Sequence, residues 1–142
     1  GIDITPEFVD MAKRRVPDAT FIQMDMREII LPPSTFDGIW VSFSLLHIHQ
    51  TDVPKVLSNL KNIMKANGKI MIALHRGPKT DWVTANISGI NQNCEVQEWI
   101  QSDLERIIQE SGFEIEYSRP FERPGGRFPL LSIMGSIPQR CQ

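Results

Sequence analysis

The sequence is poor in cysteine, has no long apolar run, and carries nearly balanced charge. Its two cysteines, Cys94 and Cys141, lie far apart and in no metal-binding spacing, so we expect no disulfide framework and a reducing, cytoplasmic location. No apolar stretch approaches membrane-spanning length and no leader opens the chain, so we expect no membrane association. Fifteen basic against seventeen acidic residues give a net charge of −2, which leaves no basic field to attract nucleic acid.

What is present is ordinary for a globular protein. Hydrophobic residues make up 41% and charged residues 23% of the 142 positions. A chain of this length can bury a substantial core without disulfides or metals. We therefore expect residues 1–142 to form a single domain.

The first half of the chain alternates between predicted strands and helices. Residues 1–4 and 20–23 alternate like short strands, and Thr5 and Pro6 between them are typical of a helix start. Residues 36–42 are apolar enough to predict a buried parallel strand. The first helix is expected to bury one face at helical spacing, made of Phe8, Met11, Ala12 and Val16.

A second predicted helix begins near Thr51 and is followed by a strand at residues 69–74. Residues 77–98 have the weakest pattern, and we expect a long irregular insert there. The helix carries a clear apolar stripe, made of Val53, Val56, Leu57, Leu60, Ile63 and Met64.

The last third predicts a helix and a closing hairpin. Ser102 and Glu105 have the spacing of a capping box at the start of that helix. Residues 113–118 and 128–134 are strand-like and flank a turn, so they are expected to pair as an antiparallel hairpin with a long loop.

This order predicts an α/β fold: an open, mostly parallel, Rossmann-like sheet with helices on both faces and a C-terminal antiparallel hairpin. In such sheets ligands bind beyond the carboxyl ends of the strands. That rule selects Asp3, Asp25, residues 42–47 and residues 75–77 as candidate site positions.

Seven segments stand out in order along the chain: GIDITPE (1–7), FIQMD (21–25), FDGIW (36–40), SLLHI (44–48), VL (56–57), NGKI (67–70) and SGFE (111–114). Taken together, these segments resemble the class I S-adenosylmethionine-dependent methyltransferases, in the small-molecule branch of that family. The family's first strand and its glycine-rich turn would precede Gly1, so we expect an incomplete domain whose sheet lacks the strand between the family's second and fourth strands.

The resemblance implies S-adenosyl-L-methionine as cofactor and assigns nucleoside contacts to four residues. Asp3 would accept the ribose hydroxyls, and Ile4 would offer an apolar face to the adenine. Asp25 would accept from the adenine amino group, and the N–H of Met26 would bind a ring nitrogen. From the residues alone, Asp3 could equally cap a helix, Asp25 could bond its own turn, and Ile4 could be core packing.

Four further residues would face the reacting end of the cofactor or the substrate. Ser42 and Phe43 would meet the methionine part of the cofactor, although a strand-to-loop transition with local hydroxyl bonds fits as well. His47 would face the substrate as a candidate catalytic base, and His75 would line the pocket floor; a structural, hydrogen-bonded role for His47 also remains open. His47 and His49 have no third ligand nearby, so we expect no metal.

The resulting functional expectation is methyl transfer to an O, N, S or C atom of a small molecule. The acceptor itself cannot be inferred from the sequence. An alternative is a non-catalytic remnant of the fold that serves as a binding or dimerisation module, and a homodimer formed by strand pairing or exchange is possible because strand edges would be exposed. A dehydrogenase is disfavoured by residues 44–47 and by the closing hairpin.

Overall fold

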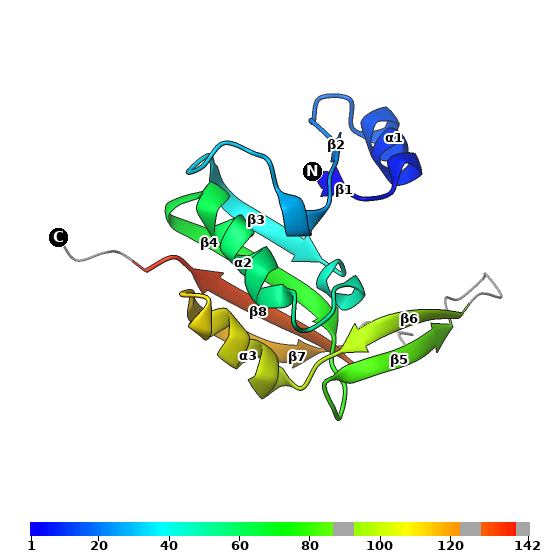
Figure 1. Ribbon diagram of the computed structural model, residues 1–142, viewed down its shortest axis with the longest axis vertical. Coiled ribbons are helices and arrows are strands. Elements are labelled where there is room, and N and C mark those ends of the chain that lie inside the picture. Colours follow the sequence, from blue (N-terminus) through cyan, green and yellow to red (C-terminus); the bar gives the residue numbers. More distant parts are fainter. Residues whose placement is uncertain (87–92, 123–128, 139–142) are drawn as a thin grey trace.

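The computed structural model describes residues 1–86, 93–122 and 129–138 (Figure 1). It contains eight strands, three α-helices and two short 3-10 turns, η1 and η2, within these ranges. In chain order they are β1 (Ile2–Asp3), α1 (Pro6–Arg15), β2 (Ile22–Gln23), η1 (Met26–Glu28), β3 (Phe36–Ser42), η2 (Leu45–His47), α2 (Val53–Ile63), β4 (Met64–His75), β5 (Asp81–Asn86), β6 (Asn93–Glu98), α3 (Gln101–Glu110), β7 (Glu114–Phe121) and β8 (Leu130–Ser136).

The strands form one sheet of four and two separate pairs. The larger sheet has the order β3-β4-β8-β7, while β1 pairs with β2 and β5 pairs with β6. The β1–β2 and β3–β4 pairs are parallel, and the other three pairings are antiparallel. The α/β class is therefore confirmed, but the prediction of a mostly parallel sheet is wrong, because the hairpins at 81–98 and 114–136 add antiparallel neighbours.

The strand pairs β1–β2 and β3–β4 are not joined to each other in the described part of the chain. The unit made of β1, β2 and α1 lies beyond the β3 edge of the larger sheet (Figure 1). No strand among the described residues bridges these two pairs.

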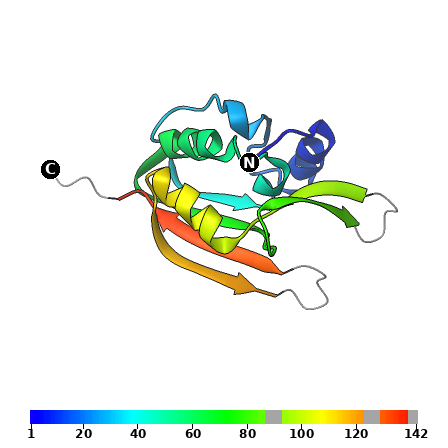
Figure 2. The same cartoon turned by 60° about the horizontal axis from the view of Figure 1, so that its bottom comes forward.

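Both α2 and α3 lie on the same face of the four-stranded sheet (Figure 2). The prediction of helices on both faces is therefore wrong for this sheet in the described ranges. The prediction that residues 36–42 are buried is also wrong, because β3 has only β4 as a described neighbour. Val41 points into the core and is 4% exposed, whereas Trp40 on the alternate face is 73% exposed.

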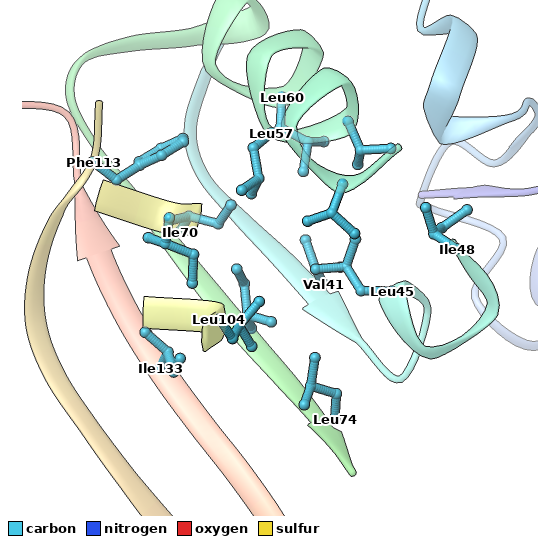
Figure 3. Close-up of a cluster of buried hydrophobic side chains, with 14 of the residues drawn as sticks. Val41, Leu45, Ile48, Leu57, Leu60, Ile70, Leu74, Leu104, Phe113 and Ile133 are labelled. Carbon is cyan, nitrogen blue, oxygen red and sulfur yellow. The ribbon is translucent and has the colours of Figure 1, made fainter. Parts of the chain in front are cut away.

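The main core forms where α2 packs on β3 and β4 (Figure 3). Every residue of the apolar stripe predicted between Val53 and Met64 is buried, which confirms that prediction. The buried side chains of β4 that complete this core come from alternate residues, namely Ile70, Ile72 and Leu74. Strand alternation and helical spacing thus place two apolar surfaces face to face.

The predicted buried face of α1 is largely exposed. Phe8 is 58% and Val16 is 50% exposed, and Val9 is the buried residue of this helix. The described contacts of α1 are with β1 and β2, which have two residues each. Such a small strand pair offers too little surface to cover an amphipathic helix.

The segment expected to be irregular contains a β-hairpin instead. Strands β5 and β6 pair in antiparallel register from Asp81↔Glu98 to Asn86↔Asn93. The hairpin is connected to β4, because the Trp99 N–H donates to the His75 carbonyl at 3.3 Å and the Gly77 N–H donates to the Trp99 carbonyl at 3.1 Å. Val96 also packs with Leu46 after β3, a contact between distant residues that local periodicity does not reveal.

The last helix starts earlier than its predicted capping box. Ile100 occupies the N-cap position, so Ser102 already lies in the first turn of α3 and cannot act as the cap. The closing hairpin is confirmed, with β7 and β8 paired from Glu114↔Ser136 to Phe121↔Leu130. None of the helices in the described ranges has the length and apolar character needed to cross a membrane.

Replacing Leu57 by alanine tests the packing of α2 on the sheet. Leu57 is fully buried, so Leu57→Ala should lower the free energy of unfolding by about 2–5 kcal/mol in urea denaturation. Ile30→Ala is the control, because Ile30 is 86% exposed and its loss should change stability by at most about 0.5 kcal/mol. Equal stability of the two variants would contradict the described core.

Candidate functional site

The candidate site residues lie at the carboxyl ends of β1, β2, β3 and β4. We call this group the candidate rim: Asp3, Ile4, Asp25, Met26, Ser42, Phe43, His47 and His75. Strand β1 pairs with β2 in parallel register, with Ile2 opposite Ile22 and Asp3 opposite Gln23. Asp25 follows two residues after Gln23, so both carboxylates leave the same end of neighbouring strands.

Asp3 shapes the turn between β1 and α1. Its Oδ1 accepts a hydrogen bond from the N–H of Thr5 at 2.8 Å, which leaves its second carboxylate oxygen without a described protein donor. Ile4, directly after it, is 59% exposed. The structure thus places an exposed carboxylate next to an exposed apolar side chain, and it rules out core packing for Ile4 within the described residues.

The carboxylate of Asp25 accepts more hydrogen bonds than that of Asp3. Its side chain accepts from the N–H of Arg27 at 2.8 Å and caps the turn η1, and the Arg27 guanidinium contacts its Oδ2 at 2.6 Å. These hydrogen bonds from Arg27 lower the pKa of Asp25. Sequence reasoning anticipated the turn role but missed Arg27, for which the spacing Asp25-x-Arg27 in an Asx turn was the available signal.

Met26 joins the N-terminal strands to the main core. Its side chain is partly buried and packs against the core under α2. Asn59 of α2 donates through its Nδ2 to the carbonyl of Arg27 at 2.9 Å. The position of Asp25 relative to β3 and β4 therefore depends on α2 as well as on strand pairing.

Ser42 and Phe43 mark the end of β3. The N–H of Phe43 donates to the carbonyl of Ala73 at 2.8 Å, and its φ of 53° turns the chain sharply into the following loop. Ser42 stays exposed, and its carbonyl accepts from the hydroxyl of Ser44 at 3.2 Å. The Phe43 ring meets the His75 ring edge-on, with centroids 5.8 Å apart.

The two histidines of the rim lie near one another and near Asp3. Partial desolvation lowers the pKa of His47, although much of its surface is exposed, and the negative charge of Asp3 opposes that change. Burial lowers the pKa of His75, and the nearby His47 lowers it further. The structure thus gathers a carboxylate and two imidazoles from β1, η2 and β4.

Sequence reasoning missed the contribution of the hairpin at 81–98 to this region. Val83 and Val96 pack around Leu46 and Phe43, and the Trp82 ring lies 6.4 Å from that of His49. The hairpin therefore covers the loop that carries His47. The signal was weak because the apolar residues of this segment are scattered among Gly, Pro, Asn and Gln.

Comparison with known proteins agrees with this geometry. A methyltransferase-domain family model matches residues 1–68. An uncharacterised methyltransferase of Synechocystis sp. is 23% identical over 120 residues, which is 81% of this chain and 56% of that protein. The chain thus spans a little over half the length of this relative.

Solved structures share the fold. A S-adenosylmethionine-dependent methyltransferase from Methanosarcina mazei matches with a TM-score of 0.81 and 14% identity, covering 96% of this chain and 80% of that one. The 1,6-didemethyltoxoflavin-N1-methyltransferase of Burkholderia thailandensis, solved with S-adenosylhomocysteine, matches with a TM-score of 0.74 and 17% identity, covering 97% and 60%.

Residues 1–68 match a methyltransferase-domain family, and the fold of the chain is that of S-adenosylmethionine-dependent methyltransferases. Solved proteins of this fold have been determined with S-adenosylmethionine or S-adenosylhomocysteine bound. The resemblance in residues 1–7, 21–25 and 44–48 is thus confirmed at the level of the family. The roles of the individual rim residues stay predictions.

The lowered pKa values of His47 and His75 predict a stability change with pH. The unfolded chain takes up protons at these residues near pH 6.5, whereas the folded protein does so only at lower pH. The unfolded state therefore binds more protons below pH 6.5, and stability should fall as the pH drops through this range. NMR titration of the ring signals should give midpoints below 6.5 for both; a midpoint at or above 6.5 would contradict the desolvation of that ring.

Proposed function

We propose that the chain belongs to an enzyme that transfers the methyl group of S-adenosylmethionine to a small molecule. The observation that carries the proposal is the convergence of Asp3, Asp25 and the two imidazoles at one end of two parallel strand pairs. Family membership supports the reaction class, and the acceptor atom stays open.

The residues present fit the nucleoside part of this cofactor. A ribose diol donates hydrogen bonds, and Asp3 retains a carboxylate oxygen that no described protein group occupies. Ile4 supplies an exposed apolar surface of the kind that stacks under a purine ring. Asp25 and the backbone of Met26 would contact the adenine edge, and Ser42 and Phe43 the methionine part.

When bound, S-adenosylmethionine supplies a methyl group already activated by its sulfonium. The protein is then required mainly to position the acceptor in line with that methyl group and to exclude water. His47 would accept a proton from an acceptor that carries one, and His75 would line the floor beneath it. A base must be neutral to act, and the desolvation of His47 favours the neutral form, so the NMR titration of His47 also tests this role.

Titration calorimetry with S-adenosylhomocysteine tests the proposal directly. Asp3→Asn should weaken binding about tenfold or more, because a hydrogen bond to a charged group contributes roughly 1.5–3 kcal/mol. Asp10→Asn, an exposed carboxylate on α1, should leave the affinity unchanged. A folded chain that shows no binding at roughly 1 mM ligand, or equal affinity for both variants, would defeat the proposed site.

A second proposal concerns association of two copies. The outer edge of β3 has no strand neighbour in the described part of the chain, so its backbone groups are open to pairing. Large apolar side chains are exposed around this edge and on the neighbouring β1–β2 unit, namely Ile4, Phe8, Ile22, Phe36 and Trp40. We propose that a strand of a second copy pairs along this edge.

Light scattering over a concentration series tests the dimer. The average mass should rise between roughly 10 and 500 µM, and Trp40→Lys should shift that rise to higher concentration. Phe121→Lys places the same charge at an exposed apolar residue of β7, at the opposite edge of the sheet, and should change nothing. A monomeric mass at every concentration would rule out the pairing.

A further inference from the structure

A cavity of about 620 Å³ lies where β4 ends and α3 begins, close to the base of the hairpin at 81–98. In Figure 1 this is the region in which β4 leads into β5, and β6 leads into α3. None of its lining residues belongs to the candidate rim. Its walls combine charged groups of both signs with apolar surface from Pro78, Ile100 and Pro129.

The carboxylate of Glu98 is the most unusual group in this cavity. Glu98 is only 9% exposed, and its carboxylate forms no hydrogen bond or ion pair with the described residues. Lys79, whose charge acts on Glu98, forms its ion pair with Asp81 at 2.6 Å instead. Burial raises the pKa of Glu98. An unpaired buried carboxylate is costly, so a cationic partner in the cavity would be strongly favoured.

Gly77 fixes where this carboxylate lies. A Cβ at position 77 would come within 2.8 Å of both Cβ and Cδ of Glu98, so the side chain is packed directly on the glycine backbone. The Gly77 backbone is itself bonded to Trp99, the residue after Glu98. The Glu98 side chain is therefore held in place by close packing between the end of β6 and the segment that follows β4.

The same cavity presents donors for an anion. Arg76 lines it, and its guanidinium makes no ion pair with the described residues, while its backbone N–H is held by the carbonyl of Pro129 at 2.9 Å. The N-terminus of α3 also opens here, because Ile100 provides no side-chain cap. The N–H groups of Gln101 and Ser102 have no acceptor among the described residues, and a helix of ten residues is positive at this end.

The other acidic residue of the cavity is already engaged. Glu105 accepts from the side-chain amide of Gln101 at 2.9 Å. Glu105 keeps a second oxygen, but Glu98 is the more buried of the two carboxylates and forms no hydrogen bond with the described residues. Its charge is opposite to that of the donors of Arg76 and the start of α3.

We propose that this cavity binds a small zwitterion of the α-amino-acid type. Its ammonium group is held by Glu98, its carboxylate by Arg76 and the free N–H groups of α3, and its side chain lies against the apolar wall. The proposal stands apart from methyl transfer, because it uses none of the rim residues.

Titration calorimetry on the full chain with three matched probes tests the charge pattern. L-phenylalanine carries both groups, 2-phenylethylamine lacks the carboxylate, and 3-phenylpropanoate lacks the ammonium. Phenylalanine should bind at least about tenfold more tightly than either of the other two, since each lost charged contact removes a strong hydrogen bond. Equal binding of the amine would overturn the zwitterion, and no binding of phenylalanine at roughly 10 mM would overturn the site.

Two variants locate the binding. Glu98→Gln should weaken the binding of phenylalanine about tenfold and leave the affinity for 3-phenylpropanoate unchanged. Arg76→Gln should weaken the binding of both of these probes and leave the affinity for 2-phenylethylamine unchanged. Glu95→Gln is the matched control, because Glu95 lies exposed on the same strand outside the cavity. Circular dichroism confirms that each variant is folded. Unchanged phenylalanine affinity in a folded Glu98→Gln variant would overturn the assignment.

Discussion

The packing of α2 against β3 and β4 is the interaction on which the rest of the structure depends. One stripe of apolar side chains on this helix covers the inner face of both strands, and the core continues from it to α3 and to the closing hairpin (Figure 3). A helix of eleven residues has little stability of its own, so burial of this stripe holds both the helix and the parallel pair beneath it. The carboxyl ends of β3 and β4, which carry Phe43 and His75, are brought together by the same contact.

The N-terminal unit reaches the candidate rim through a much smaller set of contacts. Strands β1 and β2 have two residues each and pair only with one another in the described ranges. Met26 packs against the core and Asn59 bonds the backbone beside it, so the loop after β2 is the connection that orients Asp25. The main core therefore holds the rim residues at the ends of β3 and β4, whereas few contacts hold those at the ends of β1 and β2. Contacts from a bound nucleoside to Asp3 and Asp25 would add support where the protein has least.

Several local features serve two purposes. Asp3 and Asp25 each accept from a backbone N–H two residues ahead, which shapes the turns that place them. One carboxylate can therefore shape the turn and also bind a ligand, because it has more acceptor sites than one N–H uses. Asp25 differs in that Arg27 also occupies it, so a nucleoside at this position would share the carboxylate with the guanidinium or displace it. The charge of Asp3 also acts on His47, which couples the nucleoside side of the rim to the proposed substrate side.

The sequence by itself determined the features that rest on short-range rules. The stripe of α2, the strand at 36–42 and the pairing of β7 with β8 follow from spacing, and the order of the segments places Asp3 and Asp25 at the same edge. Tertiary structure decided the remainder. The hairpin at 81–98 is held by the contact of Val96 with Leu46 and by the hydrogen bond from Trp99, after β6, to the end of β4. Helix α3 begins at Gln101 because the N–H of Ile100 donates to Thr80. Trp40 is exposed because α2 and α3 cover only the other face of the sheet. Each of these outcomes depends on contacts between residues distant in sequence, and local periodicity carries no information about which distant surface a residue will meet.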